Sequence, residues 1–205
     1  MMTVDDRLAL INKLDYQNYL NSKDKVGCPE KVTSLRQNDT NLPIVMHERE
    51  IMENVENFVV TIVCGETGSG KSTQIPKFIH EAQQVSPWKF YSGSQGIVGI
   101  TQPRRVAAVS LAQRVSDELQ TKVGDTVGYQ IRFDSEHVSS KTKVKFMTDG
   151  ILMKEVESDF MLKKYSCIMI DEAHERSLNS DVLVSLLTRI AHARCELSLK
   201  ERQTK

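Results

Sequence analysis

The sequence has no apolar run long enough to cross a membrane. No stretch approaches the roughly 20 apolar residues that span a bilayer. The polar start, MMTVDDRLAL, also lacks the basic flank and apolar core of a secretion signal. We therefore expect a soluble, intracellular protein.

Cysteine or histidine pairs at metal-ligand spacing are also missing. The four cysteines show no CxxC spacing, and the five histidines are scattered along the chain. Zinc sites and disulfide frameworks depend on such spacings. We interpret the cysteines as small apolar residues in a reducing compartment; they are Cys28, Cys64, Cys167 and Cys195.

Neither sign of charge is in excess. Lysine plus arginine and aspartate plus glutamate each number 27, so the chain has no general attraction to nucleic acid or anionic lipid. Any contact with nucleic acid must be local. The 205 residues suit one domain with a tail, and 40% hydrophobic with 26% charged residues is the composition of a globular protein.

Apolar periodicity divides the chain into alternating helices and strands. Residues 1–41 are polar and predict a weakly ordered extension. A helical repeat at Ile51, Met52 and Val55 then precedes the apolar run FVVTIVC at residues 58–64, which predicts a buried strand. That run leads directly into the glycine-rich GETGSGKS, and a helical stripe from Ile75 to Ala82 follows.

The alternation continues to the end of the chain. Strands are predicted at residues 96–101, 127–133, 144–148 and 167–170, and helices at 108–119 and 183–190. Strands that are apolar on both faces and alternate with helices predict an α/β domain with a parallel sheet covered on both faces. Ligands bind such a sheet at the carboxyl ends of its strands. We place this domain at residues 42–195 and a polar tail, truncated, at 196–205.

The glycine-rich segment fits the phosphate-loop pattern GxxxxGK followed by Ser or Thr, between a predicted strand and a predicted helix. Glycines let backbone N–H groups close around a phosphate at the helix N-terminus. Lys71 then meets the β and γ phosphates, and the Ser72 hydroxyl binds Mg²⁺. The alternative is a glycine-rich turn that only caps a helix. The candidate nucleotide-binding residues are Gly65, Glu66, Thr67, Gly68, Ser69, Gly70, Lys71, Ser72 and Thr73.

An acidic pair follows the last predicted strand. Asp171 fits the carboxylate that holds the metal of a P-loop nucleotidase, and Glu172 beside it could orient and deprotonate water. An acidic pair at this kind of position is otherwise a solvated turn or a charge at a helix N-terminus. Downstream of a phosphate loop, in the same predicted sheet, the catalytic interpretation is favoured.

Four segments in order, GETGSGKST, TQPRRVAA, KFMTDGIL and DEAHERS, resemble motifs I, Ia, Ib and II of the DEAH-box RNA helicases. The resemblance covers roughly residues 42–193 and implies the first RecA-like lobe, with ATP or another nucleoside triphosphate and Mg²⁺ as cofactors. It implies that His174 links the nucleotide to a second lobe and that Arg114 stacks on the base; a surface role is the alternative for Arg114. It also implies backbone contacts with single-stranded RNA from Arg104, Arg105, Arg132, Thr148, Asp149 and Gly150.

Two departures from the family pattern affect the expected activity. Ser72 stands where the family more often has Thr, and the hydroxyl is kept. No Ser-Ala-Thr motif and no QRxGRxGR segment follow, so we expect a fragment that awaits a second lobe and hydrolyses little nucleotide alone. A nucleotide-gated module that binds RNA or a protein activator without catalysis remains an alternative, as do a DEAH-motif DNA helicase and a P-loop kinase or GTPase.

The segment KFMTDGILMKEVESDFMLKKYS and the polar stretch after the DEAH helix are similar to one branch of the family. That branch works in nucleolar assembly of the small ribosomal subunit, which implies a location in the nucleus, in the nucleolus; the alternatives are a spliceosomal relative and a cytoplasmic location.

Overall fold

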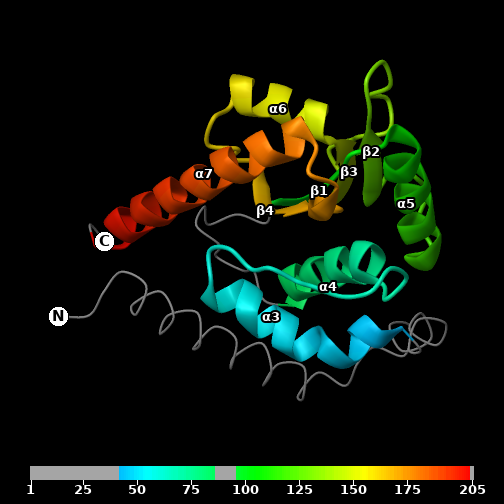
Figure 1. Ribbon diagram of the computed structural model, residues 1–205, viewed down its shortest axis with the longest axis horizontal. Helices are drawn as coiled ribbons and strands as arrows, with labels where there is room; N and C mark the ends of the chain where they lie inside the picture. Colours follow the sequence, from blue (N-terminus) through cyan, green and yellow to red (C-terminus); the bar gives the residue numbers. More distant parts are fainter. Residues whose placement is uncertain (1–41, 86–95, 204–205) are drawn as a thin grey trace. The chain divides into compact units, whose positions relative to one another are not determined.

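The computed structural model describes residues 42–85 and 96–203 (Figure 1). The expected N-terminal extension, residues 1–41, lies outside the described residues. The chain divides into two compact units. We call Met1–Trp88 the P-loop unit and Lys89–Lys205 the sheet unit, and each is described by itself.

Within residues 42–85, the P-loop unit contains three helical elements. A 3-10 helix, η2, at Pro43–His47 leads directly into α3 at Glu48–Asn57, and α4 at Lys71–Val85 follows the glycine-rich loop. The fixed φ of Pro43 suits the start of η2, and Glu48 and Glu50 place negative charge at the N-terminus of α3. Ile51 and Met52 are buried, as the helical repeat predicts.

The strand predicted at residues 58–64 is wrong for this structure. The segment carries no strand assignment, and the sheet contains β1 to β4 only. Its exposure alternates, so that Phe58, Val60 and Ile62 are 59%, 52% and 84% exposed. The apolar run predicts a buried strand, but a strand also needs a neighbour to accept its hydrogen bonds, and no pairing is assigned to residues 58–64.

The sheet unit contains four strands in the order β2-β3-β1-β4. They are β1 at Ile97–Gln102, β2 at Val127–Gln130, β3 at Val144–Thr148 and β4 at Tyr165–Ile170. All three pairings are parallel, which confirms the predicted parallel sheet. In register, Val98 lies between Val144 and Cys167, and Thr101 lies between Met147 and Ile170.

Helices cover both faces of this sheet. They are α5 at Arg105–Glu118, α6 at Asp149–Ser158 and α7 at Leu178–Gln203. The connection from β1 to β2 passes β3 in one direction, whereas the connection from β3 to β4 passes β1 in the other. Because such crossovers are right-handed, α5 and α6 lie on opposite faces.

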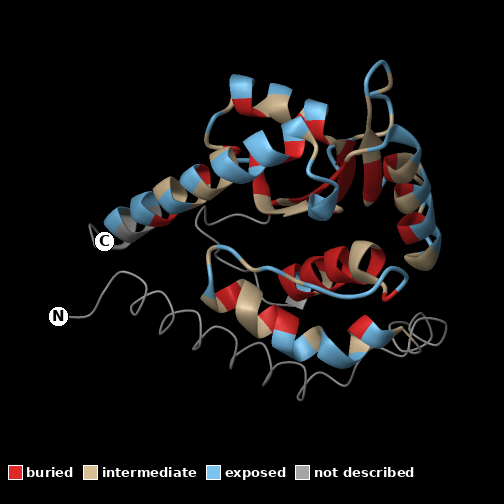
Figure 2. Cartoon of the chain, in the orientation of Figure 1, coloured by how far each residue is buried: buried red, intermediate tan, exposed pale blue. Residues whose placement is uncertain are grey.

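A hydrophobic core of the sheet unit lies under α6 and α7. Figure 2 shows buried residues along the strands and on the inner sides of these helices. Its buried members are Met147, Leu152, Val156, Leu162, Tyr165, Leu183 and Ile190. The core therefore fixes the start of α6 and the start of α7 against the ends of the strands that carry the candidate residues.

Three elements differ in extent from the sequence expectation. The TDG segment is the end of β3 and the first turn of α6, a helix that was not predicted. The strand predicted at residues 127–133 ends at Gln130, and Ile131 forms an isolated antiparallel bridge with Asp134. Helix α7 continues through the expected polar tail to Gln203. No helix among the described residues is long and apolar enough to cross a membrane.

A buried charged cluster connects α6 to the starts of β3 and β4. Lys145 Nζ donates to Glu155 Oε1 at 2.6 Å, Lys164 Nζ donates to the same oxygen at 2.9 Å, and the Tyr165 hydroxyl donates to Glu155 Oε2 at 2.5 Å. Lys145 is 2% exposed. Burial alone would raise the pKa of Glu155, but the three hydrogen bonds together outweigh it and hold this pKa below its ordinary value.

We expect Glu155→Gln to lower the free energy of unfolding at pH 7 by about 3 kcal/mol, because the buried Lys145 ammonium loses its carboxylate partner. Since the pKa of Glu155 is lowered on folding, its stabilisation is present above the unfolded pKa of about 4.3 and is lost as pH falls through the folded pKa. Urea unfolding at a series of pH values should show the difference from the parent chain shrinking below about pH 4.

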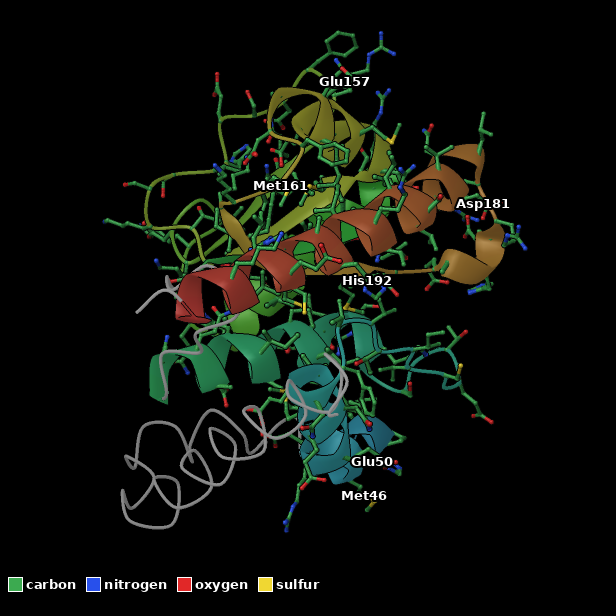
Figure 3. The ribbon with its side chains drawn as sticks, turned by 90° about the vertical axis from the view of Figure 1, so that its left-hand side faces the viewer. Met46, Glu50, Glu157, Met161, Asp181 and His192 are labelled. Carbon is green, nitrogen blue, oxygen red and sulfur yellow. The ribbon has the colours of Figure 1, made fainter. Side chains whose placement is uncertain are left out.

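Glu157→Gln is the matched control, because Glu157 is exposed on α6 (Figure 3). We expect it to change stability little. A Glu155→Gln deficit that stays constant from pH 7 to pH 3 would contradict the role given to this carboxylate.

Candidate functional site

The glycine-rich loop of the P-loop unit is held by its backbone. The N–H of Ser69 donates to the carbonyl of Glu66 at 3.3 Å, and the carbonyl of Ser69 accepts from the N–H of Ile44 in η2 at 3.1 Å. Gly68 and Gly70 have φ values of +82° and +98°. Only glycine adopts such values without strain, so these two residues set the path of the loop into α4.

Gly70 is also closely packed. A Cβ at this position would lie 2.9 Å from Ile44 Cγ2 and 3.1 Å from Leu42 Cδ1, whereas a Cβ at Gly68 would meet nothing within 4 Å. Residues 42–44 therefore pack directly on the loop. Glycine is required at position 70 because a side chain would clash with these residues, as well as for its backbone conformation.

The side chain of Lys71 turns back over the loop. Its Nζ donates to the carbonyls of Gly65 and Glu66 at 2.6 and 2.7 Å and lies 3.3 Å from Ser69 Oγ. A cation that spans the mouth of the loop is placed to meet an anion there. These carbonyl bonds hold the ammonium group of Lys71 within the loop.

The start of α4 carries the remaining loop candidates. Ser72 is half-buried in the first turn, where helical N–H groups have no partner within the helix. Thr73 is 5% exposed, and its hydroxyl donates to the Gly70 carbonyl at 3.3 Å and accepts from Gln74 Nε2 at 3.2 Å. Ser72 is therefore available to a ligand, while the Thr73 hydroxyl is used to fasten the loop to the helix. Glu66 and Thr67 are exposed.

The candidates of the sheet unit follow the carboxyl ends of its strands. Parallel pairing brings these ends to one edge of the sheet. The acidic motif follows β4, the arginine pair follows β1, the TDG segment ends β3, and Arg132 lies just beyond β2. The tertiary structure thus gathers four separated motifs along a single edge.

Asp171 is buried at the end of β4, with 5% exposure. Its N–H donates to the Thr101 carbonyl at 3.2 Å, and Gln102 Nε2 donates to its Oδ2. The N–H of Glu172 donates to its Oδ1 at 3.0 Å. A buried carboxylate held by an amide and a backbone donor is a rigid oxygen ligand of the kind that Mg²⁺ binds together with phosphate oxygens.

Glu172 adopts a left-handed backbone conformation, with φ of 53°. A glutamate rarely adopts this conformation, and such strain is concentrated at functional turns. It begins a 3-10 helix, η3, at Ala173–Glu175. His174 is 78% exposed, and its Nε2 lies 3.3 Å from Glu172 Oε2. The side chains of Glu172 and His174 are therefore adjacent, and that of His174 is accessible to solvent.

The arginines after β1 lie at the N-terminus of α5. Arg104 Nη2 donates to Glu175 Oε1 at 3.0 Å. Arg105 lines a shallow cavity of about 300 Å³ together with Ile131, which directly follows β2. In the turn between Ile131 and Asp134, Arg132 stacks over the Phe133 ring at 4.7 Å. The structure brings Arg105 and this turn together on one exposed surface.

The TDG residues divide into two groups. Asp149 is 4% exposed, and its Oδ2 accepts from Ser180 Oγ at 2.8 Å and Ser177 Oγ at 3.3 Å. Its side chain therefore fastens the start of α6 to the start of α7, and only its backbone is left for a ligand. Gly150 is exposed and uncrowded, while Thr148 is half-buried at the end of β3.

Arg114 lies on the exposed side of α5. Its Nε donates to Glu118 Oε1 at 3.0 Å, and the side chain is 60% exposed. The pair holds the guanidinium along the helix surface, with a planar face open to solvent.

Sequence reasoning missed several residues that position this edge. Gln102 binds the Asp171 carboxylate, Glu175 binds Arg104, and Ser177 with Ser180 binds Asp149. Gln102, Glu175 and Ser177 lie within the quoted motifs, so their place in TQPRR and DEAHERS was the available signal. No pattern marks Ser180 as the partner of a residue 31 positions earlier.

Among the described residues, no cluster of three or more His, Cys, Asp or Glu side chains could hold a metal ion. One carboxylate with a hydroxyl and phosphate oxygens is instead the usual ligand set of Mg²⁺ in nucleotide sites.

Comparison with known proteins gives consistent relatives. The family model described as AAA domain matches residues 58–200. ATP-dependent RNA helicase DEAH13 of Arabidopsis thaliana is 48% identical over 83% of this chain. Probable ATP-dependent RNA helicase DHR1 of Saccharomyces cerevisiae is 54% identical over 76% of it, and Probable ATP-dependent RNA helicase DHX37 of Homo sapiens is 48% identical over 77%. The matches span 13%, 12% and 13% of those relatives.

We expect Gly70→Ala to destabilise the P-loop unit more than Gly68→Ala. Both force a side chain into a positive-φ conformation, at a cost of about 1–2 kcal/mol. Only Gly70→Ala also presses a methyl group against Ile44 and Leu42, which adds about 1–3 kcal/mol. Thermal unfolding of the two variants measures the difference, and equal losses would show that the loop does not pack on residues 42–44.

Proposed function

The chain belongs to the AAA domain family and is homologous to DEAH-box ATP-dependent RNA helicases, and from this premise we propose that it is the ATP-binding lobe of such a helicase. One observation carries the proposal. The chain contains both a loop whose path is set by glycines, with Lys71 at the start of α4, and a buried carboxylate, Asp171, at the end of the parallel strand β4. Nucleotide hydrolysis by P-loop proteins uses this pair of features.

In the proposed site, Lys71 exchanges the carbonyls of Gly65 and Glu66 for the β and γ phosphates of ATP or another nucleoside triphosphate. The Ser72 hydroxyl and the Asp171 carboxylate would hold Mg²⁺, which supplies charge neutralisation at the phosphates. Gln102 keeps the Asp171 carboxylate oriented. Glu172 accepts a proton from the attacking water, and His174 transmits the state of the site to a second lobe.

RNA binding is proposed for the exposed surface at the carboxyl edge of the sheet. Arg104, Arg105 and Arg132 are exposed there, and the neutral charge of the whole chain makes such local cations necessary. Thr148, Asp149 and Gly150 contribute backbone groups, since the Asp149 carboxylate is engaged by Ser177 and Ser180. Such contacts read phosphates and sugars rather than base sequence.

The parent protein is proposed to act in nucleolar assembly of the small ribosomal subunit. The support is the resemblance of residues 145–166 to that branch of helicases. The chain spans only 12–14% of the first relatives, so unwinding itself, its RNA substrate and its protein activator belong to a longer assembly in this proposal.

Lys71→Ala should weaken the binding of a fluorescent ATP analogue in the presence of Mg²⁺ by about 10- to 100-fold, because it removes a charge-assisted contact with the phosphates. Lys154→Ala, which removes an exposed lysine on α6, is the control and should leave binding unchanged. Equal affinity of Lys71→Ala and the parent chain would refute the proposed phosphate site.

A turnover assay on the same samples distinguishes a catalytic lobe from a nucleotide-gated binding module without catalysis. Binding with little hydrolysis, with or without single-stranded RNA, is the expected result, since an arginine supplied by a second lobe accounts for about 10³- to 10⁵-fold in rate in related enzymes. RNA-stimulated turnover would show that this chain holds every catalytic group.

We expect GTP and pyrimidine triphosphates to compete with ATP within about tenfold, roughly 1.4 kcal/mol. The reason is that the proposed base contact, the open face of Arg114, stacks on any base. Competition titrations measure the preference, with Arg114→Lys as the variant that keeps the charge but loses the planar face. A hundredfold preference for ATP would contradict stacking as the main base contact.

A further inference from the structure

The acidic turn that carries Glu172 and His174 is fixed at both of its ends. Before it, Asp171 is held by Gln102 and by the Thr101 carbonyl. After it, Arg176 donates from Nε and Nη2 to Asp181 at 2.8 and 2.9 Å; Figure 3 labels Asp181 on α7. The η3 helix between these ends is bounded by two left-handed residues, Glu172 and Arg176.

One side chain connects η3 itself to another element. Glu175 Oε1 accepts from Arg104 Nη2 at 3.0 Å, across 71 positions of sequence. The other polar side chain of η3, His174, has its Nε2 3.3 Å from Glu172 Oε2. Arg104 is 74% exposed and Glu175 is 32% exposed, so solvent and ligands reach the pair.

We propose that Glu175 is a positioning residue that holds Arg104 against η3 until an RNA phosphate replaces it, so that RNA occupancy is transmitted to the acidic turn. The inference rests on the proposed function, because it takes Arg104 as a phosphate contact. The inference adds that Glu175 competes with RNA for Arg104, and that loss of the Arg104–Glu175 bond connects RNA binding to the turn that contains Glu172.

An RNA phosphate can replace the Glu175 carboxylate on Arg104 at little cost in free energy. Carboxylate and phosphate are both anions that bind the planar guanidinium through the same N–H donors, so a phosphate competes with Glu175 for the arginine. A solvent-exposed ion pair contributes little net free energy, and the phosphate can therefore displace it. Until it leaves, the Glu175 charge also repels an approaching phosphate.

Release of Glu175 has a local consequence for the turn. The side-chain bond between η3 and the N-terminus of α5 is lost, while the bonds at Asp171 and Arg176 stay in place. The part of the turn that becomes freer is therefore residues 172–176, which contain the strained Glu172 and the exposed His174. Binding of RNA would in this way alter Glu172 and His174, the residues to which the proposed function gives roles in hydrolysis.

The first test measures binding of fluorescein-labelled oligouridylate to the 205-residue chain at low salt. Glu175→Gln, which keeps the size and removes the charge, should raise RNA affinity about two- to fivefold. Arg104→Ala should lower affinity, and adding Glu175→Gln to Arg104→Ala should have no further effect. Glu157→Gln removes one exposed charge from α6 and is the matched control; it should leave affinity unchanged.

Three outcomes are informative against the proposal. Parent and Glu175→Gln chains that bind equally, while Arg104→Ala binds more weakly, would overturn the competition and leave the proposed function standing. An increase that persists in the Arg104→Ala background would show a general charge effect and would also overturn it. Absence of RNA binding by the parent chain, folded by circular dichroism, would overturn the proposed RNA contact and the inference with it.

The second test follows amide hydrogen exchange in the peptide that covers residues 171–181. RNA should speed exchange at residues 172–176 of the parent chain, and Glu175→Gln should show this faster exchange before RNA is added. The four samples are the parent chain and Glu175→Gln, each with and without RNA. If the peptide exchanges at the same rate in all four, the conformation of the turn does not depend on the Arg104–Glu175 pair. Each variant unfolds at its own temperature, so exchange is compared well below the lowest transition.

Discussion

The parallel register of β1 with β3 and β4 is the constraint on which the sheet unit depends. It aligns Gln102 with Thr148 and Thr101 with Ile170, so the residues that follow each strand emerge at one edge. Those residues belong to motifs that are distant in sequence. Right-handed crossovers then place α5 and α6 on opposite faces of the sheet.

Three polar contacts join the segment after β4 to the ends of its neighbours. Gln102 reaches Asp171, Arg104 reaches Glu175, and Asp149 reaches Ser177 and Ser180. The first and third are buried, where a hydrogen bond to a carboxylate is costly to break, whereas the second is exposed and exchangeable. The edge therefore combines a rigidly held, buried carboxylate with a neighbouring turn whose ion pair is open to solvent.

The path of the glycine-rich loop is set by local backbone conformation together with packing from outside the motif. Positive φ at Gly68 and Gly70 is local chemistry, and it directs the loop so that Lys71 lies over the carbonyls of Gly65 and Glu66. Packing of Leu42 and Ile44 against Gly70 adds a contribution from outside the motif. The conformation of this loop thus depends on a short preceding helix that no phosphate-loop pattern includes.

The sequence by itself determined the motifs, the order of most helices and strands and the parallel class of the sheet, because apolar period and glycine chemistry are local properties. It also indicated the family, which homologues at 44–54% identity support. Only the tertiary structure decided that Asp149 turns inward to Ser180, that Arg104 pairs with Glu175, and that residues 58–64 stay outside the described sheet. Each of these depends on a partner distant in sequence, and a side chain or a strand has no fixed partner until the chain has folded around it.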